Sequence, residues 1–475
     1  MPDALEPRRA HGAAGGAFRS NRMKTDTHSS VGEDPPVHMG RVVTASISGA
    51  LLEWYDFFVY GTASALFFGR VFFPTSDAAT GIIASFATYG AGFFARPLGG
   101  IIFGHFGDQR GRKSALIWTL SIVGASTFLI GLLPTYDQVG VWAPILLVAL
   151  RLVQGFGLGG EYGGAALLTI ESAPGPRRGF FGSLPQTAAS IGILLATGIV
   201  SLCDSAFTDE QMHSWGWRIP FLVSMLMLAV GMFVRTHTGE TPEFLRQRNP
   251  ATCSSSRSGE RIPLFRAFRN HPRNMVLAFC ARIAETVSSN IINAFGISYV
   301  TTQLALDRQI PLNGMLVASA IGILACPVIG WFSDRVGLRR IYLLGAVSVV
   351  LVSFPFFLLL GTASVPAIWV ALIVSYNLGP TMMFAVQPTL FTSMFGTDVR
   401  YTGLSFAYQF SAILGGLTPL ICTALLQAFD GEPWGVAAYM AVAGLVSLVA
   451  TVLIRGSSRT ASTAEPACRD VKGKD

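Results

Sequence analysis

The stretch GHFGDQRGRK at residues 104–113 lies between two long apolar segments, and a weaker copy, GWFSDRVGLRR, follows at residues 330–340. Aligning the copies pairs Gly104 with Gly330 and Asp108 with Asp334. A short basic loop repeated about half a chain apart predicts two homologous halves.

The composition is strongly apolar. Of 475 residues, 51% are hydrophobic and 13% are charged, and the mean hydropathy is +0.50. Soluble domains carry about 25% charged residues, so the bilayer must solvate most of this chain. We therefore expect an all-α membrane protein. The net charge of +7 does not form one patch but is spread between apolar segments, which argues against a nucleic-acid partner.

Twelve segments are long and apolar enough to cross a bilayer as helices, given the need for about 20 residues each. They are 43–68, 79–104, 114–133, 142–171, 180–203, 217–235, 274–304, 312–332, 340–361, 365–393, 402–428 and 434–455. A polar linker, 236–273, divides them into two six-helix bundles, 43–235 and 274–455. Such duplicated bundles are typical of transporters.

The basic residues predict the orientation. Of 34 Lys and Arg residues, only Arg70, Arg218 and Arg308 fall in the outer loops if both termini lie in the cytoplasm. Basic residues concentrate in cytoplasmic loops, so we expect both termini inside.

Several features bound the remaining possibilities. The six cysteines are scattered without ligand spacing, so neither a metal site nor a cofactor is expected. Residues 1–42 are polar and lack the apolar core of a signal peptide, which predicts a disordered cytoplasmic tail. Residues 456–475 are expected to form a second, short cytoplasmic tail.

Charged residues inside the predicted spans are the candidates for function, because each needs a partner or a watery cavity in the bilayer. They are Glu53, Asp56, Arg96, Arg151, Glu161, Arg282 and Glu285. Asp56 and Arg151 lie at similar depths in their spans, which predicts an ion pair that protonation of Asp56 would break. Glu53, one turn away, and Glu161 are the alternative proton carriers. Simple neutralisation between helices is the competing interpretation.

Arg96 and Arg282 come from opposite halves at matched depth, which predicts a two-arginine site for a carboxylate. Glu285 lies three positions after Arg282 and shares its helix face. We expect Tyr60, Gln186 and Asn290 to be polar neighbours of the substrate. Alternatively, Arg96 only caps a helix break at Pro97 or extends towards the membrane surface.

The repeated loops are predicted to form an inner gate. In the first copy, Asp108 is followed by Gly111, Arg112 and Lys113, and an acid among bases can make a breakable contact between helices. The second copy has Leu338 opposite Arg112, so its contact should be weaker. Alternatively, these bases serve topology alone.

The glycines of the fourth span match a literal GxGxxG pattern at Gly155, Gly157 and Gly160. No strand precedes it, so a dinucleotide site is not indicated. We expect these glycines to allow close approach of a neighbouring helix.

These motifs carry a family resemblance over about residues 40–455. The loop at 104–113 resembles the signature of the major facilitator superfamily, and Arg151-x-x-Gln154-Gly155 resembles its helix-4 motif linked to proton coupling. The segments LEWYDF (52–57), ARPLG (95–99), WGWRIPF (215–221) and RIAE (282–285) resemble the metabolite:proton symporter family.

The resemblance implies a monomeric symporter of the bacterial inner membrane that imports a small organic acid, such as shikimate, α-ketoglutarate or citrate, using the proton gradient. The alternative substrate class is an osmolyte such as proline or betaine. Osmolyte carriers often have a C-terminal coiled coil, and residues 456–475 show no heptads. A non-transporting receptor and a membrane enzyme are the remaining alternatives; no signalling domain, catalytic triad or P-loop is evident.

Overall fold

The computed structural model describes residues 39–74, 78–110, 112–159, 169–170, 173–237, 269, 271–396 and 400–454. Within these residues the regular structure is entirely helical. The predicted tails and most of the predicted linker 236–273 lie outside the described residues.

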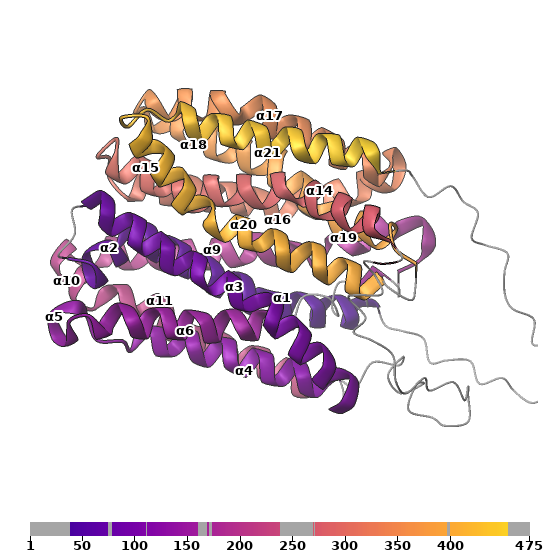
Figure 1. The fold of residues 1–475 in the computed structure, drawn as a ribbon, viewed down its shortest axis with the longest axis horizontal. Coiled ribbons are helices and arrows are strands. Elements are labelled where there is room, and N and C mark those ends of the chain that lie inside the picture. The colour runs from indigo at the N-terminus through magenta and orange to yellow at the C-terminus, as the bar shows by residue number, and fades with distance from the viewer. Residues whose placement is uncertain are drawn as a thin grey trace, which may run out of the picture. The chain divides into compact units, whose positions relative to one another are not determined.

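The first half of the chain supplies the indigo-to-magenta helices of Figure 1. They are α1 (Met39–Leu66), α2 (Phe68–Phe72), α3 (Ala78–Arg110), α4 (Arg112–Gly131), α5 (Tyr136–Val139), α6 (Trp142–Leu158), η1 (Gly175–Arg177), α8 (Arg178–Ser183), α9 (Thr187–Ala206), α10 (Asp209–Ser214), η2 (Gly216–Arg218) and α11 (Ile219–His237). α1 packs on α9, α3 on α6, and α4 on α11.

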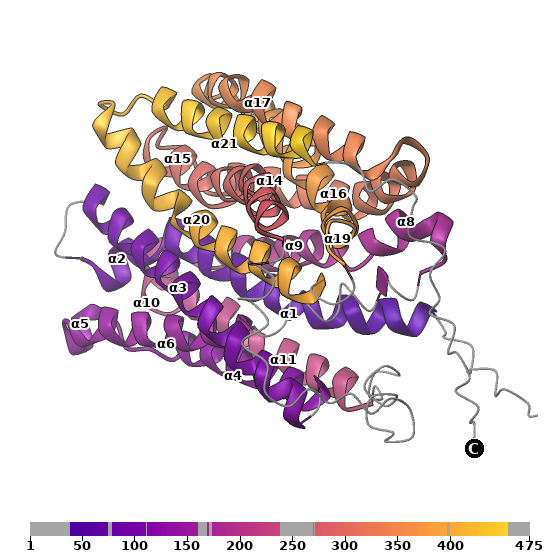
Figure 2. The same ribbon diagram turned by 45° about the vertical axis from the view of Figure 1, so that its right-hand side comes forward.

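The second half supplies the orange-to-yellow helices, which gather on the other side of the views in Figures 1 and 2. They are α14 (Pro272–Asn290), η3 (Ile291–Phe295), α15 (Gly296–Thr302), α16 (Gln309–Val336), α17 (Leu338–Gly361), α18 (Val365–Tyr376), η4 (Asn377–Thr381), α19 (Met382–Thr392), α20 (Arg400–Ala428) and α21 (Trp434–Leu453). Here α14 packs on α20 and α21, and α17 on α21.

The described helices follow the predicted spans in order. Nine helical segments of the described residues are long and apolar enough to cross a bilayer. Helices α1, α3 and α6 take the places of the predicted first, second and fourth spans. The prediction of an all-α membrane protein is therefore confirmed. Most helix ends lie a few residues from the expected ones, and the end of the fourth span, predicted at residue 171, follows a stretch outside the described residues.

Large apolar side chains remain on the outside of these helices. Leu324 on α16 is 72% exposed, and Leu202 on α9 is 69% exposed. Water would oppose so much apolar surface, whereas lipid tails solvate it without cost. The helix exteriors therefore suit a bilayer.

Glycines bring α3 and α6 into backbone contact, as the sequence predicts for the fourth span. A Cβ atom at Gly155 would lie 1.8 Å from the carbonyl oxygen of Gly92, and one at Gly99 would lie 1.8 Å from that of Phe156. No side chain fits at such distances, so the two helices depend on glycine here. The contact fixes Arg96 on α3 and Arg151 on α6 relative to each other.

The two halves meet mainly through two helix pairs, α9 with α16 and α3 with α20. The described residues of both halves belong to one compact unit. The bundle boundaries at 43–235 and 274–455 stay predictions.

Candidate functional site

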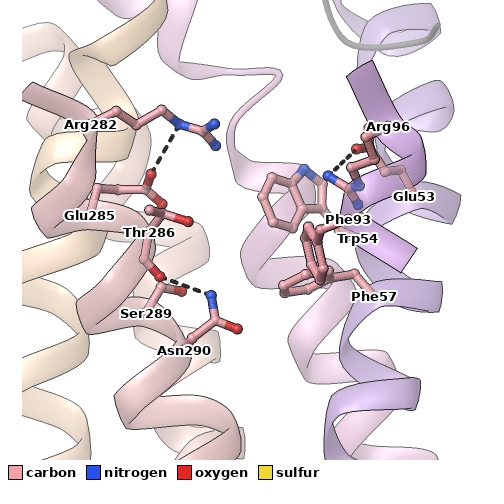
Figure 3. A pocket seen from close by; sticks show the side chains of 10 residues that line it. All are labelled: Glu53, Trp54, Phe57, Phe93, Arg96, Arg282, Glu285, Thr286, Ser289 and Asn290. Carbon is pink, nitrogen blue, oxygen red and sulfur yellow. Dashed lines mark hydrogen bonds and ion pairs between the residues drawn. The ribbon is translucent and has the colours of Figure 1, made fainter. Parts of the chain in front are cut away.

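Four of the buried charged residues in the described spans gather near the contact between the halves. Glu53, Arg96, Arg282 and Glu285 are all at least nine-tenths buried. All four line one pocket, together with Trp54, Phe57, Phe93, Thr286, Ser289 and Asn290. Figure 3 shows Glu53 and Arg96 on one side of this central pocket and Arg282 and Glu285 on the other. The expectation that Arg96 and Arg282 meet across the two halves agrees with this geometry.

On the first-half side, Arg96 pairs with Glu53. The Nη1 atom of Arg96 lies 3.9 Å from Oε1 of Glu53, and its guanidinium carbon lies 4.6 Å from the ring centroid of Phe93. Such a cation–ring contact stabilises a guanidinium that is desolvated by burial. The Glu53–Arg96 pair therefore presents its charges to the pocket while remaining neutral overall.

On the second-half side, Arg282 is held on α20 and pairs with Glu285. Its Nη1 donates to the carbonyl oxygen of Tyr408 at 2.6 Å and to Oγ of Ser411 at 3.0 Å. Its guanidinium carbon lies 3.6 Å from the ring centroid of Tyr408, and its Nε lies 3.4 Å from Oε2 of Glu285. Arg282 is thus fixed by α20, while Glu285 is its partner on the pocket side (Figure 3).

A second pocket adjoins the first. It is lined by Trp54, Phe58, Gln186, Ala189, Ser190, Glu285, Ser289, Cys326, Tyr376, Pro380, Thr381 and Phe384. Trp54, Glu285 and Ser289 line both pockets, so the two spaces meet along α14 and α1. The hydroxyl of Tyr376 lies 3.3 Å from that of Ser190, which joins the halves across this hydroxyl-rich pocket.

Irregular helix segments shape both pockets. Ser289 and Asn290 immediately precede the π-helical turn η3, and Pro380 and Thr381 lie in the π-helical turn η4. Gln186 lies in the break between α8 and α9, where Pro185 supplies no backbone N–H. Such breaks aim polar groups into a cavity between apolar helices.

Asn290 joins the halves directly. Its Oδ1 accepts a hydrogen bond from the Tyr89 hydroxyl on α3 at 2.9 Å, and its Nδ2 donates to the Thr286 carbonyl at 2.8 Å. The predicted substrate contact at Asn290 therefore coincides with a bond between the two halves.

The first half also holds a sealed cluster, whose members are buried and line neither pocket: Arg151, Gln154, Tyr60 and Tyr89. The predicted Asp56–Arg151 ion pair does not form between these two described side chains. Arg151 instead donates to Gln154 Oε1 and to the Tyr89 carbonyl, the latter at 3.4 Å, and Asp56 acts on it only at longer range. Asp56 and Arg151 lie at similar depths, but the guanidinium of Arg151 is hydrogen-bonded to the neutral Gln154, one turn away on α6.

Tyr60 belongs to this sealed cluster and not to the pockets. Its ring centroid lies 4.1 Å from the guanidinium carbon of Arg151, and its hydroxyl donates to Thr88 Oγ1 at 2.8 Å. Tyr60 and Asp56 are fully buried and line neither pocket. The prediction that Tyr60 touches the substrate is thus not supported by its position.

At the end predicted to face the cytoplasm, the second loop copy joins the halves. The carboxylate of Asp334 accepts hydrogen bonds from the backbone amides of Gly179, at 2.6 Å, and Phe180, at 2.9 Å. Gly330 allows this approach, because a Cβ there would lie 2.2 Å from Ser183 Oγ. A carboxylate at the start of α8 also suits the positive end of that helix.

The first loop copy cannot be compared in the same way. Gly104 and Asp108 lie in α3, and Arg112 and Lys113 begin α4, but their side chains are outside the described residues, as is Gly111. Glu161 also lies outside them. Their roles, and the predicted weakness of the second copy, stay predictions.

At the opposite end, an ion-pair cluster closes the halves together. Arg308, just before α16, lies 2.9 Å from Asp204 on α9 and 2.6 Å from Asp209 on α10. Gln309 adds a bond from its Nε2 to Asp204 at 3.0 Å and accepts one from Ser201 at 2.7 Å. Contacts between the halves are therefore present at both ends, with the pockets between them.

Sequence reasoning missed several of these residues. The polar or aromatic pocket residues that it did not select are Trp54, Phe57, Phe58, Phe93, Ser190, Thr286, Ser289, Tyr376, Thr381 and Phe384. Serines, threonines and aromatics are common throughout the spans, so nothing in the sequence sets these apart. Arg308 and Asp204 had a usable signal, since both are charged residues at the outer ends of spans. In the described part of the chain, no group of His, Cys, Asp and Glu is arranged to hold a metal ion.

Known protein families match almost the whole span region. The family described as "Sugar (and other) transporter" matches residues 42–263, and "MFS/sugar transport protein" matches residues 175–454.

Curated relatives extend this match. The Shikimate transporter of Escherichia coli is 42% identical over 88% of this chain and 95% of its own length. An inner membrane metabolite transport protein of the same organism is 36% identical, over 87% of this chain and 93% of its own length. Its Proline/betaine transporter is 33% identical, over 91% and 87% respectively. These relatives are transporters and not enzymes.

Solved structures agree on the fold. A D-xylose–proton symporter superposes with a TM-score of 0.65 and 17% identity over 88% of this chain and 97% of its own. A partially occluded, inward-open form of the E. coli xylose transporter gives 0.67 and 16%, over 87% and 96%. The chain belongs to the major facilitator superfamily, in the group of metabolite transporters that includes the shikimate and proline/betaine transporters.

Proposed function

We propose that the protein imports a small organic anion together with protons across the bacterial inner membrane, and that it does so as a monomer. The observation that carries this proposal is the central pocket, where two arginines and two glutamates from opposite halves face one another. Two guanidiniums offer paired N–H donors that match a carboxylate. The 42%-identical relative named as a shikimate transporter supports this substrate class.

The charge balance of the pocket explains why protons would accompany the anion. The Glu53–Arg96 and Arg282–Glu285 pairs sum to zero charge when all four groups are ionised. A carboxylate adds one negative charge to a site from which water is largely excluded, and an uncompensated buried charge is strongly unfavourable. A proton that enters with the anion restores neutrality. The proton gradient is then the driving force, and no cofactor is required.

The hydroxyl-rich second pocket refines the substrate class. A carboxylate at the central pocket leaves the rest of the ligand beside Ser190, Ser289 and Tyr376. These groups suit an organic acid with ring hydroxyls, of which shikimate is the natural probe. An apolar acid would make no hydrogen bonds to these groups.

Transport would proceed by alternating access. The contacts at Asp334 and at Arg308 would open in turn, each releasing one end while the other stays closed. We propose that the protonation state of Asp56, which Arg151 senses, determines which end opens. Glu53 and Glu161 are further proton-coupling residues in this proposal. In this orientation both termini lie in the cytoplasm, and Asp334 belongs to the inner gate.

An osmolyte is the second candidate substrate. Trp54, Phe57 and Phe93 form an aromatic wall of the central pocket that could hold a quaternary ammonium. A relative that is 33% identical is named a proline/betaine transporter. A zwitterion brings no net charge, however, so pocket neutrality gives it no reason to move with a proton.

Uptake into proteoliposomes distinguishes the two classes. Purified full-length protein is reconstituted, an inward proton gradient is imposed, and radiolabelled shikimate or glycine betaine is added outside. We expect shikimate to accumulate and unlabelled organic acids to compete with it. Accumulation of betaine without shikimate would replace this proposal by the osmolyte one.

A further inference from the structure

We propose that Glu285 is the acid that takes up the co-transported proton, because the carboxylate of the substrate takes its place at Arg282. This inference rests on the proposed function, since it requires an anionic substrate. It assigns the substrate-linked proton to the second half of the chain instead of to the first-span acids Glu53 and Asp56.

The position of Glu285 sets it apart. It is the one acid among the residues that line both pockets, whereas Glu53 lines only the central one. A ligand whose carboxylate lies at Arg282 can extend past Ser289 towards the hydroxyls of Ser190 and Tyr376. Arg96 and Glu53 lie across the central pocket from Arg282 and Glu285 (Figure 3), and neither of them lines the second pocket, where these hydroxyls lie. Arg282 is therefore the arginine that fits a hydroxylated acid.

Arg282 cannot move away with its partner. Its Nη1 atom donates hydrogen bonds to the Tyr408 carbonyl and to Ser411 Oγ, and its guanidinium stacks on the Tyr408 ring. These contacts hold the guanidinium against α20. Glu285, by contrast, lies on the same helix, α14, with its Oε2 atom 3.4 Å from Nε of Arg282. An arriving carboxylate thus meets a fixed cation whose present partner can turn aside.

The surroundings of Glu285 leave its released carboxylate poorly compensated. Charged and titratable groups that face it come from its own helix, from packed helices and from across the pocket: Arg282, Tyr342, Tyr376, Cys326, Tyr408, Glu53 and Arg96. The other base among them, Arg96, already pairs with Glu53. Gln387 on α19 is a neutral neighbour that can bond to a protonated or an ionised carboxyl group.

These relations couple the two ligands. An ionised Glu285 beside a bound anion leaves one buried negative charge too many, and a proton without the anion leaves Arg282 without a counter-charge. Only the empty and the doubly loaded pockets are neutral, so only these states close readily at both ends. The proton comes from water on the outer side, binds a Glu285 oxygen, and leaves to water on the inner side when the anion departs.

The test compares net accumulation with exchange in proteoliposomes, using radiolabelled shikimate. For the wild-type protein, an inward gradient of one pH unit should support roughly tenfold accumulation if one proton accompanies each anion. Glu285→Gln, which resembles the protonated acid, should retain exchange of internal for external shikimate. It should also lose accumulation, with an inside-to-outside ratio near unity, and lose the proton influx that accompanies uptake. Glu285→Asp should restore both the accumulation and the proton influx.

The outcomes separate the two proposals. If the wild-type protein fails to accumulate shikimate with protons, the proposed function fails. If the wild-type protein is coupled and Glu285→Gln still accumulates shikimate with protons, the inference is wrong and the proposed function stands. Equal loss of exchange and accumulation would also overturn it, because Glu285 would then serve binding alone. Glu285→Ala replaces the glutamine variant, with the same readings, if that variant does not reconstitute.

Discussion

The central pocket and the sealed Arg151 cluster are two solutions to the same problem, an arginine inside a membrane. In the pocket, Arg282 pairs with the acid Glu285 beside an open space. In the sealed cluster, Arg151 is enclosed by Gln154, a backbone carbonyl and the Tyr60 ring. A charge that borders a cavity can exchange its partner for a ligand. A charge enclosed by protein groups can interact only with those groups. We therefore propose that binding and conformational response depend on different arginines.

The largest effect is expected from breaking the pocket pair on the second-half side. Arg282→Ala leaves Glu285 buried without its cation, which should reduce the free energy of unfolding by roughly 3–5 kcal/mol. Shikimate binding should be lost as well. Thermal unfolding in detergent and equilibrium binding measure the two effects.

A double variant serves as the control. Arg282→Met combined with Glu285→Met replaces the pair by apolar side chains of similar volume, which should restore stability without restoring binding. If binding returned with stability, the pocket would not recognise the anion through Arg282.

Removing the arginine of the facing Glu53–Arg96 pair should have the next largest effect. Arg96→Met removes one guanidinium from the pocket, and hydrogen bonds to charged groups contribute roughly 1.5–3 kcal/mol, or a 10- to 150-fold weaker Kd. Arg96→Lys keeps the charge and should recover part of the affinity. An unchanged Kd in Arg96→Met would mean that Arg96 only stabilises the break at Pro97.

A variant of the sealed cluster should separate rate from binding. Gln154→Leu removes the side chain that accepts a hydrogen bond from Arg151. Because Gln154 lines neither pocket, the Kd of shikimate should stay within about twofold, while the uptake rate falls roughly tenfold. Thr127→Val removes the hydroxyl that accepts from Gln154 Nε2 at 2.6 Å and donates to the Val123 carbonyl, and it leaves the Arg151–Gln154 bond in place, so it should have a smaller effect on rate. A weaker Kd in Gln154→Leu would join the two regions into one binding site.

The smallest effect is expected at the outer contacts. Arg308→Ala removes its bonds to Asp204 and Asp209, and the latter side chain is 80% exposed. The pair with the exposed Asp209 contributes little, and the pair with Asp204, whose side chain is 10% exposed, supplies most of the effect. The outward-open population should rise by no more than about fivefold. Labelling of Ser190→Cys by a membrane-impermeant thiol reagent reports this population. A decrease in labelling would show that Arg308 holds the outer side open.

The sequence predicted the fold more completely than the site. The lengths of the apolar segments and the repeated loop predicted all the spans in order. Bilayer thickness fixes the length of a spanning helix, and the need to satisfy backbone hydrogen bonds in lipid favours helices. Arg96, Arg282 and Glu285 were found because charge is rare in a membrane. Depth along a helix does not fix the direction of a side chain, so the Asp56–Arg151 pair and the placement of Tyr60 were wrong.

The most direct test of the account is to count protons that enter with shikimate. Wild-type proteoliposomes containing a pH-sensitive dye receive shikimate in the absence of an imposed gradient, and dye signal and radiolabel are read together. We expect internal acidification that rises in proportion to shikimate uptake, with one proton entering for each molecule. Shikimate uptake at an unchanged internal pH would contradict it.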